Sequence, residues 1–510
     1  MTRQLHGAAR AALVAIALLA SGAGREARAA DEPTVRIARG AGGRSLDPHL
    51  GARLEDRPVL HVLYESLVDV TEDSQFVPGL ARSWSVARDG LAVTFRLQPG
   101  VKFHDGTEFD ANAVKWNVER VMDPATKSEH QSRFAEAIQS VDVVDKHTVR
   151  FNLKQAFPPL LSVLIDRPGL MVSPTAARKL GADFARNPVG TGPFRFVEWV
   201  PGNRVVLEKF PGYWQAGKPL VGGMIFLDVP EPAVRLAKLR AGELDLIYDV
   251  AARDVAALAG DQAFRVVESR GMRFDSIQLR VDVPPFDNRA LREAIALAID
   301  RNEIHQVIYQ GAGKPSGKLF AANWWANPEY GGMAYAPERA RQKLAEAGYP
   351  NGVNLTLYVP SASDDLRTGE LIQAQLAKVG IKAKIQLVDP NDHYVKVLRG
   401  EISFTAPMRW TPYTDPHELA WILFHSKGYA NSSKYRNPEV DKLLEAGLSS
   451  YDENARRRAY REAERLIVED ASYVFYHFTP RFAAHRSALT GFQWMPNLIP
   501  RFRDVALQPR

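Results

Sequence analysis

Segments with helical and with strand spacing alternate between residues 337 and 408, and this alternation constrains the fold more than any other feature of the chain. We expect helices over residues 337–347, 365–379 and 393–398, and strands over residues 355–359, 381–388 and 402–408. Gly348 and Gly380 follow two of these helices, where glycine commonly ends a helix. The pattern is typical of a parallel sheet with right-handed crossovers, so the second half is expected to hold an α/β lobe.

Other elements flank this region. Apolar residues at helical spacing, with Gly311 placed to cap the end, predict one helix over residues 290–310. A long helix over 453–469 and a strand over 473–478 are expected near the C-terminus. The first half is mixed, with strands expected over 92–97, 149–153, 205–208 and 224–227, and a helix over 111–122.

The first 29 residues have the layout of a secretory signal peptide. Arg3 and Arg10 come before a stretch of ten apolar residues, 11–20. Small residues then follow, up to Ala29. Ten apolar residues fall short of the about 20 that span a bilayer, so a membrane anchor is the less favoured interpretation. We expect cleavage near Ala29 or Ala30. The chain has no cysteine for acylation, so a lipoprotein is not expected.

Composition excludes several classes of protein. A net charge of +6 over 510 residues is too small to argue for nucleic-acid binding. The absence of cysteine removes disulfides and thiol nucleophiles, so the fold must depend on burial alone. A chain of this length can bury a large core and divides into domains of about 50 to 200 residues.

Motifs that would indicate an enzyme are incomplete. His417-Glu418 begins like a zinc-protease helix, but Trp421 stands where the second histidine is required. Gly311-Ala312-Gly313-Lys314 resembles part of a phosphate loop, yet Pro315 occupies the Ser/Thr position. Neighbouring carboxylates could serve a glycosidase, but such pairs are more often solvated or capping residues. We therefore expect no catalysis, no metal site and no cofactor.

Seven short stretches occur in a fixed order along the chain. They are Leu46-Asp47-Pro48-His49, Tyr64-Glu65-Ser66-Leu67-Val68, Leu80-Ala81-Arg82-Ser83-Trp84, Gly100-Val101-Lys102-Phe103-His104-Asp105-Gly106, Asn187-Pro188-Val189-Gly190-Thr191-Gly192-Pro193-Phe194, Gly212-Tyr213-Trp214, and Pro285-Phe286-Asp287-Asn288 before Arg292-Glu293-Ala294. Together they resemble the extracytoplasmic solute-binding proteins of family 5, the receptors of peptide and nickel ABC importers. The resemblance runs from about Val35 to Leu507 and is strongest to the glutathione and dipeptide receptors.

This resemblance implies an α/β, two-lobe periplasmic binding protein fold of type II, cluster C, with an extra subdomain in the first lobe. The implied division is a signal peptide (1–29), lobe I (30–273 and 480–510, with the subdomain at about 67–171) and lobe II (274–479). It further implies a monomeric periplasmic receptor that captures a di- or oligopeptide or a glutathione-like solute. The partners would be the permease subunits of an ABC importer in the inner membrane, with no nucleic acid.

The segment from Arg409 to Pro416 follows an expected strand of the α/β lobe, and ligands of such sheets lie at the carboxyl ends of strands. The resemblance places a tryptophan beside the ligand here, which is Trp410, with Tyr413 as a weaker companion. Core packing is the alternative for Trp410. Pro412 replaces the aspartate that peptide receptors use for the ligand's ammonium group, whereas Arg409 offers a planar fork suited to a carboxylate.

Further candidates also come from the resemblance. Arg167 matches the position of an arginine in nickel-complex receptors, Arg133 and Phe134 lie in the inserted subdomain, and Arg367 begins a helix of lobe II. Arg53 is a candidate of lower rank. A surface position is an equal alternative for each arginine, because most arginines are exposed.

Two alternatives remain open beside the peptide receptor. A receptor for a nickel-chelate complex is supported by Arg167 and by Trp410 with Asp415-Pro416-His417. A secreted hydrolase belongs to another class and lacks a recognisable pair of nucleophile and base. The sequence leaves the identity of the solute open.

Overall fold

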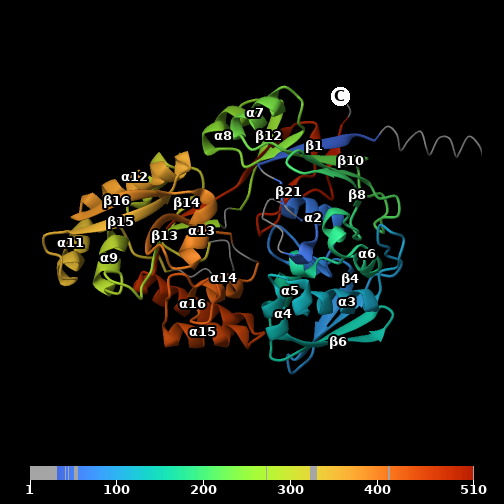
Figure 1. Ribbon diagram of the computed structural model, residues 1–510, viewed down its shortest axis with the longest axis horizontal. Helices are drawn as coiled ribbons and strands as arrows, with labels where there is room; N and C mark the ends of the chain where they lie inside the picture. Colours follow the sequence, from blue (N-terminus) through green and yellow to red (C-terminus); the bar gives the residue numbers. More distant parts are fainter. Residues whose placement is uncertain are drawn as a thin grey trace, which may run out of the picture.

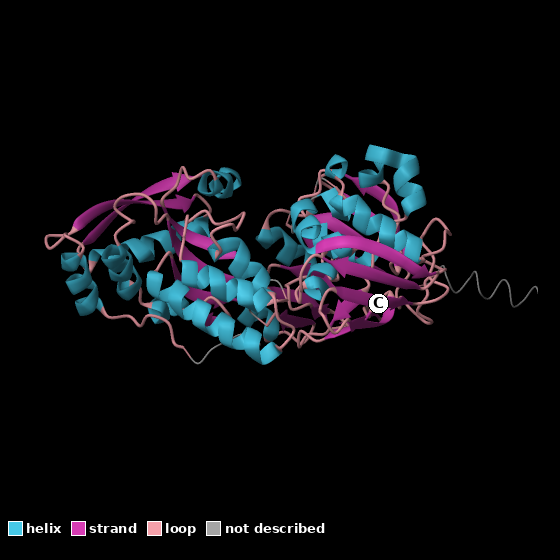
Figure 2. Cartoon of the chain, turned by 90° about the horizontal axis from the view of Figure 1, so that it is seen from below, coloured by secondary structure: helices cyan, strands magenta, loops and turns pink. Residues whose placement is uncertain are grey.

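The computed structural model describes residues 32–40, 42–43, 45–50, 56–270, 273–321, 330–411 and 414–508. These residues form two halves that lie side by side, each built on one large sheet (Figure 1). The view from below shows the same two halves, with helices packed around the strands of each (Figure 2). None of the described helices is both long and apolar enough to cross a bilayer.

Lobe I is built on a seven-stranded sheet that collects strands from distant parts of the chain. Its order is β12-β19-β11-β1-β10-β9-β8, in which β1 lies parallel to β10 and β11. The strands are β1 (Thr34–Arg39), β8 (Phe194–Val200), β9 (Arg204–Lys209), β10 (Gly223–Asp228), β11 (Leu246–Tyr248), β12 (Phe264–Glu268) and β19 (Phe482–Arg486). Its helices are α2 (Arg57–Leu63), α6 (Pro174–Leu180), α7 (Pro232–Arg240) and α8 (Ala252–Ala259). Because β19 comes from the C-terminal tail, lobe I is discontinuous in sequence.

A smaller sheet of order β4-β5-β7-β6 and three helices form the inserted subdomain. Its elements are β4 (Ala81–Val86), β5 (Ala92–Leu97), β6 (Ile138–Asp145), β7 (Thr148–Leu153), α3 (Ala111–Met122), α4 (Gln131–Ala137) and α5 (Leu160–Leu164). The helix expected over residues 111–122 begins and ends where α3 does, because the Asp110 side chain caps its first turn. The subdomain has its own apolar core, which includes Phe95, Phe103 and Phe151.

Lobe II is built on a six-stranded sheet of order β14-β18-β13-β17-β15-β16. The strands are β13 (Arg273–Leu279), β14 (Lys314–Pro315), β15 (Val353–Pro360), β16 (Ile381–Val388), β17 (Phe404–Trp410) and β18 (Tyr473–Thr479). The helices are α9 (Arg289–Ala298), α10 (Arg301–Val307), α11 (Pro337–Glu346), α12 (Ser363–Ala377), α13 (Pro390–Leu398), α14 (Pro416–Phe424), α15 (Pro438–Leu448) and α16 (Glu453–Asp470). Only β15, β16 and β17 pair in parallel, whereas β13 pairs antiparallel with β17 and β18. The parallel pairing expected for the strands of the βαβ region is therefore confirmed, and antiparallel strands, for which no pairing was predicted, extend the same sheet.

The single helix expected over residues 290–310 is two helices, so that prediction is wrong. Helix α9 ends at Ala298, Ile299 is extended, and Asp300 caps α10 by accepting hydrogen bonds from the N–H groups of Asn302 (3.0 Å) and Glu303 (3.1 Å). The apolar spacing continues across the break because both helices bury the same side against the sheet. An aspartate that satisfies two N–H groups favours a new helix start over a continuous helix.

Two segments connect the lobes and form the hinge. One runs from β12 to β13, and the other from β18 to β19 through Pro480 and Arg481. Between them, the Ser269 N–H donates to the Arg481 carbonyl oxygen (2.8 Å), and the Arg481 N–H donates to the Ser269 hydroxyl (2.7 Å). The two crossings therefore lie side by side, so that a small number of backbone torsions can change the angle between the lobes.

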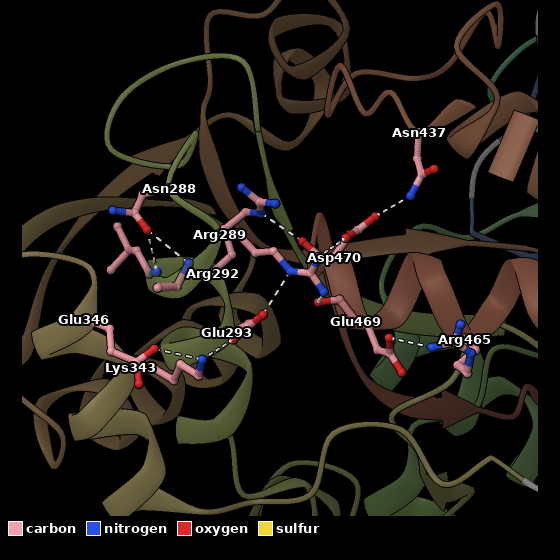
Figure 3. Close-up of polar contacts among 12 residues, drawn as sticks. Asn288, Arg289, Arg292, Glu293, Lys343, Glu346, Asn437, Arg465, Glu469 and Asp470 are labelled. Atoms are coloured by element: carbon pink, nitrogen blue, oxygen red, sulfur yellow. Dashed lines mark hydrogen bonds and ion pairs between the residues drawn. The ribbon is translucent and has the colours of Figure 1, made fainter. Parts of the chain in front are cut away.

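Residues of the short stretches that carry the resemblance have structural roles. Burial raises the pKa of Glu65 to about 7, and this side chain accepts hydrogen bonds from the Tyr213 hydroxyl (2.7 Å) and the Trp214 indole N–H (3.0 Å). In lobe II, Asn288 caps α9, and Arg292 donates to the Asp470 carbonyl oxygen at 2.9 Å (Figure 3). Such motifs therefore identify the fold, and other residues are expected to bind the solute.

Candidate ligand-binding cleft

A cavity lies between the two lobes beside the hinge, with a volume of about 930 Å³ that includes space open to solvent. We call it the hinge pocket. Lobe I contributes residues 249–253, at the end of β11 and the start of α8. Lobe II contributes the start of β13, the segment after α10, the first turns of α12 and the end of β17, and residues 479–482 of a crossing also line the pocket. Carboxyl ends of strands therefore meet at this pocket, as is usual for ligand sites of α/β sheets.

Arginines outnumber carboxylates in the lining of the hinge pocket. The charged lining residues are Arg253, Arg273, Arg367, Arg409, Arg481, Asp249 and Asp364. A concave surface with an excess of guanidinium groups favours ligands that carry carboxylates or other anionic groups.

Asp275 lies behind the pocket and organises its lobe II side. This carboxylate is fully buried in β13 and accepts hydrogen bonds from the Tyr309 hydroxyl and the Thr479 hydroxyl (3.1 Å). The Nε atoms of Arg273 and Arg409 lie 3.3 and 3.4 Å from its oxygens. Burial alone would raise the pKa of Asp275, but the two arginines lower it below its usual value, so the group is an anion.

Arg409 is held by two carboxylates. Besides Asp275, its Nη2 lies 2.6 Å from Oδ1 of Asp365 in the first turn of α12. Burial would lower the pKa of Arg409, but the charges of Asp275 and Asp365 raise it, so Arg409 stays a cation. Two of its three nitrogens are therefore already engaged, which leaves one side of the fork for a ligand.

Arg481 is engaged in the same way on the lobe I side. Its guanidinium group makes two hydrogen bonds to the carboxylate of Asp249, of 2.8 and 2.9 Å. Both residues lie at the ends of lobe I strands, so this pair does not cross between the lobes. The ion pairs of the hinge pocket are therefore formed within each lobe separately.

Arg367 and Arg253 differ from these engaged arginines. Arg367 is exposed on α12 and makes no hydrogen bond or ion pair with the other described residues. Arg253 is exposed on α8 of the opposite lobe, and its contact is to the neighbouring Asp254 at 3.9 Å. The two side chains line the same pocket from the two lobes, and are the cations most accessible to a ligand.

Trp410 lies on the other side of the lobe II sheet from Arg409, because successive residues of a strand point to opposite faces. Its ring packs edge to face with Tyr394 of α13, with centroids 5.7 Å apart, and against the apolar core beside α14. The ring of Trp410 and the guanidinium group of Arg409 therefore lie on opposite faces of the lobe II sheet.

The remaining predicted residues are dispersed. Arg167 lies in a short turn of the inserted subdomain, with its Nε 3.8 Å from Asp166, which also pairs with Arg57 at 3.0 Å. Phe134 packs in the core of the subdomain, 2% exposed, and faces that core. Arg53, Tyr413 and the side chain of Arg133 lie outside the described residues.

The sequence analysis did not identify Arg273, Asp275, Tyr309 or Arg481. A weak signal was present, because Arg273 and Asp275 are charged residues at spacing i, i+2 in a strand at a crossing. Their grouping with Tyr309 depends on the pairing of β13 with β18, which sequence spacing does not show. Among the described residues, no group of three or more histidine, aspartate or glutamate side chains could hold a metal ion.

Comparisons with known proteins agree with this architecture. The family model described as bacterial extracellular solute-binding proteins, family 5 Middle, matches residues 75–431. Glutathione-binding protein GsiB of Salmonella paratyphi A is 32% identical over 506 residues, which cover 97% of this chain and 98% of the relative. The structure of periplasmic DppA from Helicobacter pylori with peptide STSA superposes with a TM-score of 0.83 at 27% identity, over 94% of this chain and 98% of that one. NikA from Brucella suis with Fe(III)-EDTA gives a TM-score of 0.84 at 25% identity, over 94% and 100% of the two chains.

Proposed function

The chain belongs to the bacterial extracellular solute-binding proteins of family 5, and from this premise we propose that it captures an anionic, peptide-like solute for an ABC importer. The solute is a di- or oligopeptide or a glutathione-like compound, bound between the lobes and delivered unchanged to permease subunits in the inner membrane. The protein acts in the periplasm as a monomer, after removal of a signal peptide at residues 1–29.

The observation that carries this proposal is the hinge pocket, where Arg253 of lobe I and Arg367 of lobe II face the same space. A carboxylate bound there would bridge the lobes and favour their closure. Arg409 adds a third cation whose position is fixed by Asp275 and Asp365. Charge-assisted hydrogen bonds in a closed, dehydrated pocket give both affinity and selectivity for carboxylates.

The other candidate residues within the described part of the chain lie outside the lining of the hinge pocket, and their part in the site is proposed from the resemblance to the family. Trp410 would offer an aromatic surface for the rest of the solute, and Arg167 a cation on the side of the inserted subdomain. Arg53, Arg133, Phe134 and Tyr413 remain candidates on the resemblance to the family. The proposed division is lobe I (30–273 and 480–510, with the subdomain at about 67–171) and lobe II (274–479).

A metal chelate is a second candidate, because the NikA neighbour was solved with Fe(III)-EDTA. The described residues contain no cluster that could ligate a metal directly. In this alternative the arginines of the hinge pocket would bind the carboxylates of the chelator, and the protein would recognise the organic part of the complex.

Native mass spectrometry of the protein isolated from its own periplasm is the decisive experiment, because a bound mass identifies the solute. We expect a peptide-like compound with at least one carboxylate. Calorimetric titration with dipeptides, glutathione and nickel plus a chelator then compares the candidates. Binding of the nickel chelate alone would replace the peptide proposal, and conversion of the bound compound into a product would overturn the assignment as a binding protein.

A further inference from the structure

The two halves of the molecule meet a second time, far from the hinge, where the inserted subdomain contacts lobe II (Figure 1). The Ser162 hydroxyl on α5 donates a hydrogen bond to the carboxylate of Glu418 on α14 and accepts one from the backbone N–H of Asp415 (3.0 Å). Ser162 and Glu418 are only 3% and 2% exposed. These three residues form what we call the distal contact.

Contacts within lobe II hold Asp415 and Glu418 in place independently of Ser162. The Asp415 carboxylate caps α14 by accepting from the His417 N–H (2.9 Å), and it pairs with the buried Arg456 at 2.8 Å. Arg456 also donates to the Gly447 carbonyl oxygen at the end of α15 (2.8 Å). The N–H of Asp415 and the carboxylate of Glu418 are therefore presented by a rigid helix start.

Apolar contacts surround these hydrogen bonds. Leu448 of α15 is part of the same buried cluster as the core of the inserted subdomain, and Trp421 of α14 packs against that cluster. The ring of Tyr451 lies over the β4–β5 turn, where a Cβ added at Gly90 would be 3.0 Å from it. Ser162 and Glu418 are thus buried by apolar neighbours, while a cavity lined by Phe157 and Trp421 adjoins the contact.

The covalent connectivity of the chain does not require the inserted subdomain to contact lobe II. The inserted subdomain is joined at both of its ends to lobe I, and lobe I is joined to lobe II only through the hinge. Rotation about the hinge would separate Ser162 from Glu418 and would leave the hydrogen bonds within each half intact. The distal contact therefore exists only in an arrangement in which the halves are closed upon one another.

We propose that the distal contact is a latch, in which Ser162 and Glu418 set the equilibrium between closed and open arrangements and so the rate of solute release. Both groups can bind water when the halves separate, so the net gain on closure is that of an ordinary hydrogen bond to a charged group. Such a contact changes a two-state ratio by about tenfold, which leaves the latch reversible. The effect on release rests on the proposed function, whereas the equilibrium between the two arrangements is a property of the protein without its solute.

The test uses a pair of spin labels, one on each half. The chain has no cysteine, so Val144→Cys in the subdomain and Leu387→Cys in lobe II would carry the only labels. Both positions are exposed, at 59% and 51%. Pulsed electron paramagnetic resonance on the solute-free protein should show a shift toward longer distances in Ser162→Ala and in Glu418→Gln, with the closed fraction lowered about tenfold relative to the open one.

Ser426→Ala is the matched control, because it also removes a hydroxyl that donates to a carboxylate, but the acceptor, Asp441, lies in the same lobe. It should leave the label distances unchanged. With glutathione as the probe, stopped-flow release should be about tenfold faster in Ser162→Ala at an unchanged association rate. Label distances in both latch variants that match Ser426→Ala would overturn the latch. Failure of glutathione to bind would count against the proposed solute only, since the distances are measured without it.

Discussion

The hinge pocket and the distal contact lie at opposite ends of the space between the two halves, and they are built from different interactions. At the hinge pocket, charged side chains pair within their own lobe: Arg409 with Asp275 and Asp365, and Arg481 with Asp249. At the distal contact, the neutral hydroxyl of Ser162 joins the halves by hydrogen bonds to the Glu418 carboxylate and from the Asp415 N–H.

This difference separates two properties of a binding protein. Ion pairs within a lobe persist when the lobes rotate apart, so the charge pattern of the hinge pocket is ready before the solute arrives. Contacts that cross between the halves are lost on opening, so they govern how long the closed arrangement lasts. We expect substitutions at the hinge pocket to change stability and affinity, and substitutions at the distal contact to change closure.

The largest effect is expected for Asp275→Asn. The substitution leaves Arg273 and Arg409 without their shared buried anion, and such losses destabilise a protein by about 3 kcal/mol. Urea unfolding followed by tryptophan fluorescence measures this change. Asp282→Asn is the control, because Asp282 pairs with Arg280 on the surface and should contribute less than about 1 kcal/mol. Equal losses in the two variants would show that Asp275 does not organise the pocket.

The pH dependence of this difference has a defined sign. Burial raises the pKa of Asp275, but Arg273 and Arg409 lower it below the value of about 3.9 expected in the unfolded chain. The stabilisation is therefore complete above about pH 4 and is lost as the pH falls through the native pKa. Wild type and Asp275→Asn should converge in acid, and a constant difference down to about pH 2 would contradict this assignment.

Arg367→Ala is expected to have the next largest effect, on affinity and not on folding. Arg367 makes no hydrogen bond or ion pair with other described residues, so its loss leaves no carboxylate unpaired, but an anionic solute would lose a charge-assisted bond of about 2 kcal/mol. Calorimetric titration with glutathione should show this loss, together with an unchanged melting temperature. Arg399→Ala, an exposed arginine at the end of α13, is the control for net charge. Equal affinities in the two variants would remove Arg367 from the site.

Local features of the fold were predictable from the sequence. The helix at 111–122 and the strand at 381–388 have the expected bounds, because a capping aspartate and alternating apolar residues act over a few positions. The break at Asp300 was not predicted, since apolar spacing continues across it. Here a side-chain cap decided the local structure against the periodic pattern.

The candidate site was predictable only in part. Arg367 and Arg409 were both expected and both line the hinge pocket, but the sequence does not show that Asp275, 134 residues away, already engages Arg409. The distal contact joins Ser162 and Glu418 across 256 residues and was not predicted either. Such pairs depend on how lobes and subdomain are placed in space, and no local propensity carries that information.

Salt is expected to affect the hinge pocket and the distal contact differently, and the expected change is smaller than that of Arg367→Ala. Raising NaCl from about 0.05 to about 0.5 M shortens the Debye length severalfold and should weaken glutathione binding by about threefold to tenfold. The label distances of the solute-free protein should change less, because the neutral hydroxyl of Ser162 makes the hydrogen bonds that join the halves at the distal contact. Salt-dependent distances together with salt-independent affinity would reverse the roles that we assign to the two ends.

The smallest effect is expected for Tyr451→Ala. The ring of Tyr451 covers Gly90 of the inserted subdomain but remains 39% exposed, so opening the halves returns only part of its surface to water. The loss of this partial burial corresponds to less than about 1 kcal/mol, or a decrease of the closed fraction by about threefold. Tyr335→Ala is a matched control, because Tyr335 has the same 39% exposure on lobe II.

Both variants should bind glutathione with the same association rate, and only Tyr451→Ala should lengthen the label distances. An identical response of the two variants would confine the latch to Ser162 and Glu418, since the surrounding apolar surface would then contribute nothing to closure.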